Sequence, residues 1–246
     1  MHNPFSAREA AAHSLSAPLD ALTPEGLSTA TFGVGSFWTP DARFGIVEGV
    51  WRTRVGYAGG DRPNPTYHDL GDQTECFQVD FDPSVISYRE LVDLAFASHN
   101  PVWPAHKAQF ASLVLAHDDG QLAVARERGA RASSMLGRPL ATRIEPLKRF
   151  WPAEDYHQKY YLRQDRILTG ELSGMFGDDQ AAFRDSTAAA KVNGYAAGDG
   201  TKAQLGVEID FLGLSEKGRA HLVSMVRDGV FGGSCTVGSR PTPEVL

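Results

Sequence analysis

The stretch TECFQVDFDP, residues 74–83, constrains the fold most strongly, because its side chains alternate strictly along the chain. A period of two predicts a β-strand and excludes an amphipathic helix. One face of this strand carries Glu75, Phe77, Val79 and Phe81, and the other carries Cys76, Gln78 and Asp80. We therefore expect Glu75 to point into apolar surroundings, where loss of hydration raises the pKa of a carboxyl group.

The neighbouring segments predict helices and strands in alternation. TATFGV (29–34) is typical of a buried strand, DARFGIVEGV (41–50) of a helix with Pro40 in its first turn, and VWRTRVGY (50–57) of a strand. AGGDRPNPTYHDLGD (58–72) predicts a long irregular loop. SYRELVDLAFASHN (87–100) predicts a helix, because Ser87 and Glu90 have the spacing of a capping box.

Four more segments complete a core between residues 29 and about 165. SLVLAH (112–117) and ATRIEPL (141–147) predict strands, and GQLAVARERGARASSML (120–136) and PAEDYHQKYYLRQD (152–165) predict helices. The order β-α-β-β-α-β-α-β-α begins with the split β-α-β plan. We expect an α/β (α+β) protein, a two-layer ferredoxin-like sandwich with a mixed sheet.

The two ends of the chain predict separate regions. Residues 1–28 show no sustained period and are expected to form a loosely packed or partly helical N-terminal arm. Residues 166–246 are expected to form a C-terminal helical extension and tail, interrupted from Gly170 to Gly177. LSEKGRAHLVSMVRDG (214–229) is its clearest helix, with Ser215 as the cap. The domains are therefore predicted as 1–28, 29–165 and 166–246.

Charge and composition exclude several classes of protein. The net charge is −6, and the basic residues are scattered, so neither a nucleic-acid footprint nor a polybasic membrane patch is predicted. No apolar stretch approaches the roughly 18–20 residues of a membrane span, and the N-terminus lacks the pattern of a secretory signal. These features favour a cytoplasmic protein.

Cysteine and acidic side chains give little support for a metal centre. The only cysteines, Cys76 and Cys235, are too few for a disulfide framework or a four-thiolate site. His68, Asp69, Asp72 and Glu75 have the spacing of no standard metal site. We expect no bound metal.

Six phrases carry a family resemblance: GSFWTPDARF, WRTRVGYAGG, NPTYHDLGD, ECFQVDFDP, SYRELVDLAFASHNP and FWPAEDYHQKYY. In this order the chain resembles the A-type peptide methionine sulfoxide reductases over residues 29 to about 161. The resemblance implies an oxidoreductase that takes methionine-S-sulfoxide, in protein or as a small molecule. It also implies attack by a cysteine thiolate, a sulfenic acid and then a disulfide, which thioredoxin or another thiol reductant reduces, with no bound cofactor.

The resemblance also implies a set of site residues. Where the family has Gly-Cys-Phe-Trp, this chain has Gly35, Ser36, Phe37 and Trp38, so Ser36 stands at the nucleophile position. Phe37 and Trp38 are then expected to enclose the methyl group of the sulfoxide. Glu75 is expected to be the acid, and Tyr57 to bind the sulfoxide oxygen.

Other expected substrate contacts depart from the family pattern or come from a later segment. In AHKAQFAS (105–112), Ala105 and Phe110 replace an aspartate and a tyrosine of the family, while Gln109 matches. His106 is a neighbouring polar side chain that could compensate. The resemblance further implies that His157 and Glu154 line the site, although acidic residues at a helix start also simply complement the helix dipole.

Ser36 leaves the chemistry open. A serine hydroxyl is a poor nucleophile without an adjacent base, and oxygen cannot pass through the sulfenic acid on which sulfoxide reduction depends. Three explanations remain: the serine was introduced in place of a cysteine; Cys235, in the Gly-rich GGSC tail, acts as nucleophile or resolving thiol; or the pocket binds or turns over a small sulfur compound by acid–base chemistry without a redox step.

Overall fold

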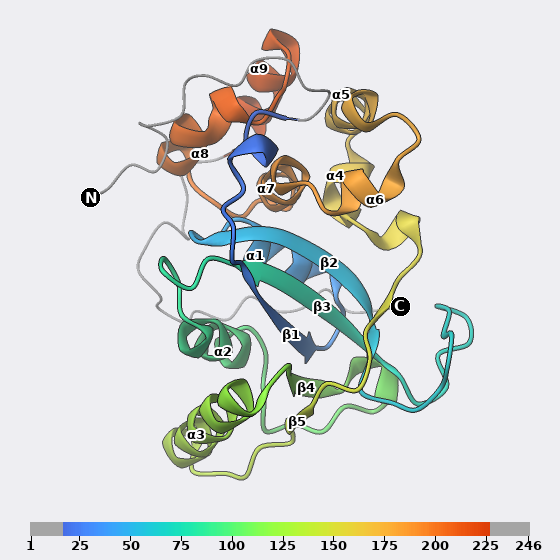
Figure 1. Ribbon diagram of the computed structural model, residues 1–246, viewed down its shortest axis with the longest axis vertical. Helices are drawn as coiled ribbons and strands as arrows, with labels where there is room; N and C mark the ends of the chain where they lie inside the picture. Colours follow the sequence, from blue (N-terminus) through green and yellow to red (C-terminus); the bar gives the residue numbers. More distant parts are fainter. Residues whose placement is uncertain (1–16, 227–246) are drawn as a thin grey trace.

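A six-stranded mixed sheet forms the centre of the protein, in a computed structural model that describes residues 17–226 (Figure 1). The strand order is β5-β4-β1-β3-β2-β6. The strands are β1 (Ser28–Val34), β2 (Val50–Ala58), β3 (Thr74–Phe81), β4 (Ser112–Ala116), β5 (Arg143–Pro146) and β6 (Trp151–Pro152). Only the β4–β5 pair is parallel among these six strands. The predicted α/β class with a mixed sheet is confirmed.

Helices connect successive strands, and β3 lies between β1 and β2 in the sheet. Helix α1 (Trp38–Gly45) connects β1 to β2, and α2 (Tyr88–Ala97) connects β3 to β4. Helix α3 (Asp119–Leu136) then leads to β5 at the sheet edge. Ser87 caps α2 in a complete capping box with Glu90, as predicted. Strands β4, β1, β3 and β2 are thus neighbours in that order, whereas the two-layer ferredoxin-like sandwich stays a prediction.

The two faces of β3 pack against different surroundings, as its alternation predicts. Phe77, Val79 and Phe81 lie in the main core, together with Phe44 of α1 and Leu91 of α2. Cys76 lies on the reverse face, in a small cluster with Leu113 and Leu115. Glu75 is therefore on the face that packs against the helices.

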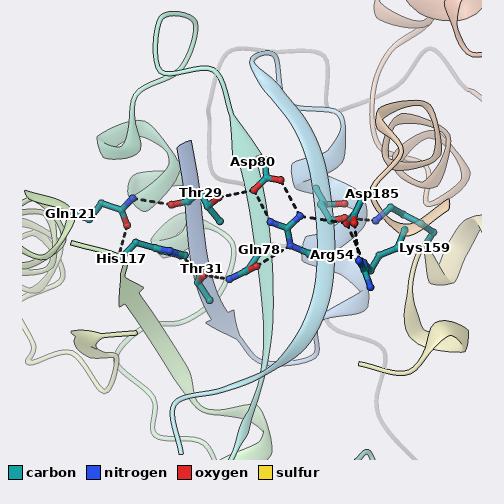
Figure 2. Close-up of polar contacts among 11 residues, drawn as sticks. Thr29, Thr31, Arg54, Gln78, Asp80, His117, Gln121, Lys159 and Asp185 are labelled. Carbon is teal, nitrogen blue, oxygen red and sulfur yellow. Dashed lines mark hydrogen bonds and ion pairs between the residues drawn. The ribbon is translucent and has the colours of Figure 1, made fainter. Parts of the chain in front are cut away.

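A chain of polar contacts crosses the rest of the reverse face (Figure 2). The Arg54 guanidinium donates to both carboxylate oxygens of Asp80, at 2.7 and 2.9 Å, and to Gln78 at 2.9 Å. Gln78 donates in turn to the hydroxyl of Thr31, which is 2.8 Å from His117 Nε2. Arg54 also lies 3.5 Å from Asp185, so this network reaches the C-terminal helices.

A second hydrophobic cluster is built from helices beyond the sheet, which gather at one end of the molecule (Figure 1). They are α4 (Tyr160–Gln164), α5 (Arg166–Phe176), α6 (Gln180–Arg184), α7 (Thr187–Ala196), α8 (Lys202–Glu208) and α9 (Glu216–Met225). Ser215 caps α9, as predicted. The predicted division into 1–28, 29–165 and 166–246 stays a prediction.

Three local predictions are wrong. Helix α1 begins at Trp38 and ends at Gly45, earlier at both ends than the predicted 41–50. Helix α5 runs through Gly170, where an interruption was expected, because its buried Leu168 and Leu172 pack into the second cluster. In the predicted arm, whose residues 1–16 lie outside the described residues, Ala17 and Leu19 are buried in that cluster rather than loosely packed. The 3-10 helix Asp20–Leu22 agrees with the expected partly helical character.

The fourth correction concerns residues 152–165, which do not form one helix. Trp151 and Pro152 pair with β2, a short 3-10 helix spans Asp155–His157, and α4 begins only at Tyr160. Lys159 interrupts the helix, since its φ of 56° is left-handed.

Candidate active site

The predicted nucleophile position lies in the turn between β1 and α1. Gly35 has a φ of 97°, a conformation that glycine adopts without steric cost and that turns the chain out of the strand. Ser36 is exposed, and no described residue forms a hydrogen bond with its hydroxyl. Phe37 is buried, and Trp38 begins the helix.

Glu75 lies directly beneath this turn. Its carboxylate accepts hydrogen bonds from the Phe37 backbone N–H at 3.1 Å and from the Gln109 side chain at 2.7 Å. Burial raises the pKa of Glu75, and these two hydrogen bonds only partly oppose the effect. The site therefore holds a carboxyl group that retains its proton to a higher pH than an exposed glutamate does.

Tyr57 is fully buried and bonded to a second carboxylate. Its hydroxyl donates to Glu154 at 2.7 Å, and the other oxygen of Glu154 accepts from the Tyr67 backbone N–H at 2.9 Å. Burial disfavours the Glu154 charge, but these hydrogen bonds outweigh it and hold the pKa of Glu154 below its usual value. Burial and the neighbouring Glu154 raise the pKa of Tyr57. The pKa of Glu154 is thus lowered, whereas the pKa of Glu75 is raised.

Aromatic rings form a wall beside Glu75. The Phe37 ring centroid lies 5.9 Å from that of Tyr57 and 5.2 Å from that of His157. Trp38 stacks on Tyr160 at 4.0 Å with an interplanar angle of 12°. We call Phe37, Trp38, His157 and Tyr160 the aromatic wall.

His157 has one nitrogen in use and one without a partner. Trp38 Nε1 donates to His157 Nδ1 at 3.2 Å, so Nδ1 carries no proton and the neutral ring carries it on Nε2. Burial lowers the pKa of His157, which favours this neutral form. Nε2 is buried and forms no hydrogen bond with a described residue. It is therefore a buried donor whose hydrogen-bonding capacity no described residue uses.

His157 and Tyr160 belong to residues 153–162, which we call the return segment. Gln158 anchors it to the edge of β2, accepting from the Val55 N–H at 3.0 Å and donating to the Val55 carbonyl at 2.9 Å. Lys159 Nζ donates to the Thr53 carbonyl at 2.5 Å and lies 3.5 Å from Asp41. Burial lowers the pKa of Lys159, while Asp41 opposes that shift.

The structure does not join every predicted residue to the site. His106 is exposed and Phe110 is half-buried, and within residues 17–226 neither has a hydrogen bond or ring contact with Glu75 or the aromatic wall. Cys235 lies outside the described residues. Cys76 is buried on the reverse face, and burial raises the pKa of its thiol.

Three contributors were not predicted as site residues. Gln109 bonds Glu75, Tyr67 lies 4.6 Å from the His157 ring, and Tyr160 stacks on Trp38. Tyr67 and Tyr160 lie in NPTYHDLGD and FWPAEDYHQKYY, two phrases that carried the family resemblance, and Gln109 matched the family pattern. The position of these residues in the motifs shared with the family was the sequence signal that could have identified them.

Residues 17–226 contain neither a metal-binding cluster nor a membrane-spanning helix. No three His, Cys, Asp or Glu side chains there gather in a group that could hold a metal ion. No helix in that range has the length and apolar character needed to cross a membrane.

Comparisons with known proteins agree on one family. The model of the peptide methionine sulfoxide reductase family matches residues 28–188. A peptide methionine sulfoxide reductase of Drosophila melanogaster is 40% identical over 200 residues, covering 79% of this chain and 78% of the relative. Peptide methionine sulfoxide reductase A5 of Oryza sativa is 37% identical, covering 69% and 68%. The solved structure of methionine sulfoxide reductase A of Corynebacterium diphtheriae is 27% identical with a TM-score of 0.52, covering 58% of this chain and 77% of that one.

Proposed function

The chain belongs to the peptide methionine sulfoxide reductase family of oxidoreductases, and on that premise we propose that Glu75 and the aromatic wall bind methionine sulfoxide for reduction. The observation that carries the proposal is the buried Glu75 carboxyl beneath the turn, beside the rings of Phe37 and Trp38. Apolar rings suit the methyl group of the substrate, and a protonated carboxyl suits its polar oxygen.

Glu75 supplies the proton in this proposal. Reduction of a sulfoxide removes its oxygen, and proton donation from a positioned acid assists that step. The raised pKa of Glu75 keeps the required proton in place. The Tyr57 hydroxyl has a single proton, already donated to Glu154, so Tyr57 binds the sulfoxide oxygen only after exchanging that partner.

The electrons come from a thiol. A thiolate attacks the sulfoxide sulfur, the oxygen passes to the thiol sulfur, and the products are the thioether and a sulfenic acid. A second thiol then forms a disulfide and releases water. The Ser36 hydroxyl cannot carry this oxidation, and Cys76 is buried on the reverse face. We assign the attacking thiol to Cys235.

The test is turnover of methionine-S-sulfoxide, free and within a peptide, with dithiothreitol and with thioredoxin. We expect turnover by the unaltered protein, loss of turnover in Cys235→Ala, and retained turnover in the matched control Cys76→Ala. Retained turnover in Cys235→Ala would overturn the thiol assignment.

The Ser36→Cys variant separates the pocket from the thiol. Turnover by Ser36→Cys alone would show that the pocket is a reductase pocket and that Cys235 does not serve it. Binding that depends on Glu75 but is indifferent to Cys235 and to thiol reagents would instead favour the non-redox alternative. No binding by any variant would remove the pocket assignment itself.

The reductant, the cofactor requirement and the location of the protein also belong to the proposal. Thioredoxin is proposed as the physiological reductant on the family resemblance, and the expectation of no bound cofactor accompanies it. The contacts expected of His106 and Phe110 with substrate, the cytoplasmic location and the absence of a nucleic-acid partner stay predictions from the sequence.

A further inference from the structure

Asn193, on α7, connects two elements that carry the aromatic wall. Its side chain is fully buried. Nδ2 donates to Asp41 of α1 at 3.0 Å, and Oδ1 accepts from the Leu162 backbone N–H of α4 at 3.0 Å. Both ends of one amide are therefore used, and each end fixes a different helix.

These two helices begin with the two stacked rings. Trp38 is the first residue of α1, and Tyr160 is the first residue of α4. Asp41 and Leu162 lie within the first turn of their helices, so Asn193 holds each helix close to its ring. A shift of either helix would change the 4.0 Å stacking of Trp38 on Tyr160.

The packing of α7 against α1 makes this connection rigid. A Cβ atom added at Gly45 would lie 2.6 Å from the Ala190 carbonyl oxygen, and one added at Gly194 would lie 2.7 Å from the Ala42 carbonyl oxygen. The two helices thus approach each other at their backbones, and the Ile46 side chain just beyond α1 also packs against Gly194, so little space is left for a displacement.

Besides Asn193, the Asp41 carboxylate has one polar side-chain neighbour among the described residues, Lys159. The second carboxylate oxygen of Asp41 forms no hydrogen bond with a described residue and lies 3.5 Å from Lys159 Nζ. Asp41 is completely buried. Its orientation therefore depends on Asn193 and on the return segment together.

We propose that Asn193 is a positioning residue for the aromatic wall, through which the C-terminal helices set the affinity of the site for its sulfoxide substrate. This inference rests on the proposed function for the identity of the ligand only. The family match ends at residue 188, so Asn193 lies beyond the matched region.

The test compares Asn193→Leu with Gln204→Leu. Leucine has the same branched arrangement of side-chain heavy atoms as asparagine, although it is larger, and it neither donates nor accepts a hydrogen bond. Gln204 is the matched control, because its side chain joins α8 to the Ile46 carbonyl, just beyond the opposite end of α1 from Trp38. Both variants remove a polar contact between the C-terminal helices and the α1 region, but only Asn193→Leu removes one in the first turn of α1, near Trp38.

Two readouts are measured at a temperature where each variant is folded. The first is the dissociation constant of N-acetyl-methionine-S-sulfoxide, by calorimetry without reductant and with Cys235→Ala in every variant, so that the proposed thiol does not reduce the probe. The second is the near-ultraviolet circular dichroism of the stacked aromatic rings. We expect Asn193→Leu to weaken binding roughly tenfold or more and to change the spectrum, because displaced binding groups lose affinity steeply. Gln204→Leu should leave both unchanged.

Failure of the positioning role of Asn193 can be distinguished from failure of the proposed function. If the unaltered protein does not bind the probe, the proposed function fails, and the spectrum still decides whether Asn193 positions the rings. Unchanged binding and spectrum in Asn193→Leu, or equal losses in both variants, would overturn the positioning role.

An exchange variant covers the case in which Asn193→Leu does not fold. Asn193→Asp retains the acceptor for Leu162 and loses the donor to Asp41. Adding Asp41→Asn restores a donor and acceptor pair in the reverse order. Weak binding in the single variant and recovery in the double variant supports the proposal, whereas equal binding in the two contradicts it.

Discussion

The turn at residues 35–38 and the return segment at 153–162 contribute to the same aromatic wall but are anchored differently. The turn follows a central strand and is held by the buried Glu75 carboxyl, through the Phe37 N–H. The return segment lies at the edge of β2 and is held by two buried polar side chains, Gln158 and Lys159. One side is anchored by the sheet core, and the other by a few long-range polar contacts.

Within this one site, the residue at the reactive position and the residue expected to stabilise the fold lie in different segments. Ser36, at the position expected to react, is exposed, and its hydroxyl forms no hydrogen bond with a described residue. Lys159 takes no part in the proposed reaction, but its side chain is completely buried beside the buried carboxylate of Asp41. Substitutions in the return segment should therefore affect folding much more than substitutions at the turn.

The largest effect is expected for Lys159→Met. Removal of the cation leaves Asp41 buried without its counter-charge, which costs about 3–5 kcal/mol of unfolding free energy. Urea denaturation measures the loss. The matched control is Lys148→Met, which breaks the exposed, solvent-screened pair with Asp61 and should leave stability nearly unchanged. Equal losses in the two variants would contradict the comparison.

A smaller loss is expected for Gln158→Ala. The Val55 N–H and carbonyl lose their buried partner, which costs about 1–3 kcal/mol in the same denaturation experiment. Gln164→Ala is the control, because Gln164 is exposed and its one bond, to Tyr160 O, is 3.4 Å long. A stable Gln158→Ala protein would show that Lys159 and β6 hold the return segment without Gln158.

Glu75→Gln should alter how stability depends on pH. Burial raises the pKa of folded Glu75 above its unfolded value, so its stabilising contribution is complete below the unfolded pKa and is lost as pH rises through the folded pKa. The variant should lack this loss in denaturation curves measured from below to above the ordinary pKa of a glutamate.

Glu90→Gln provides a control of opposite sign. Hydrogen bonds from Ser87 lower the pKa of Glu90, so its contribution is present above the unfolded pKa and is lost as pH falls through the folded pKa. If Glu75→Gln changed the pH dependence in the same direction as Glu90→Gln, the carboxyl beneath the turn would have to be ionised more readily than its burial implies.

The smallest effect is expected for Ser36→Ala, within about 0.5 kcal/mol of the unaltered protein. Ser87→Ala is the informative contrast, because Ser87 also precedes a helix but caps it, and its loss should cost about 1 kcal/mol. A loss at Ser36 as large as that at Ser87 would show that the Ser36 hydroxyl contributes to the start of α1.

Local patterns predicted the turn side of the site and failed on the return side. Strict alternation identified β3 and placed Glu75 with Phe77, and the Ser87–Glu90 spacing identified α2. Residues 152–165 have a helix-like composition, but contacts with β2 break the helix at Lys159. No local pattern specifies a partner more than a hundred residues away, as Gln158 is from Val55.

The bond between Asn193 and Asp41 was unpredictable for the same reason. An asparagine within a run of small residues gives no indication of its partner, and Gly45 and Gly194 acquire meaning only when α1 and α7 are seen in contact. Family membership supplied Trp38, Glu75 and His157, whereas the supports behind them required the structure.

The close contact between α1 and α7 has a practical consequence for shortening this protein. The family match stops at residue 188, and α7 spans Thr187–Ala196, so that limit falls in the first turn of the helix. A fragment trimmed there would strip α1 of its closest neighbour and expose Asp41 to water. Its catalytic performance would report on a damaged pocket, and a sound truncation has to retain α7 whole.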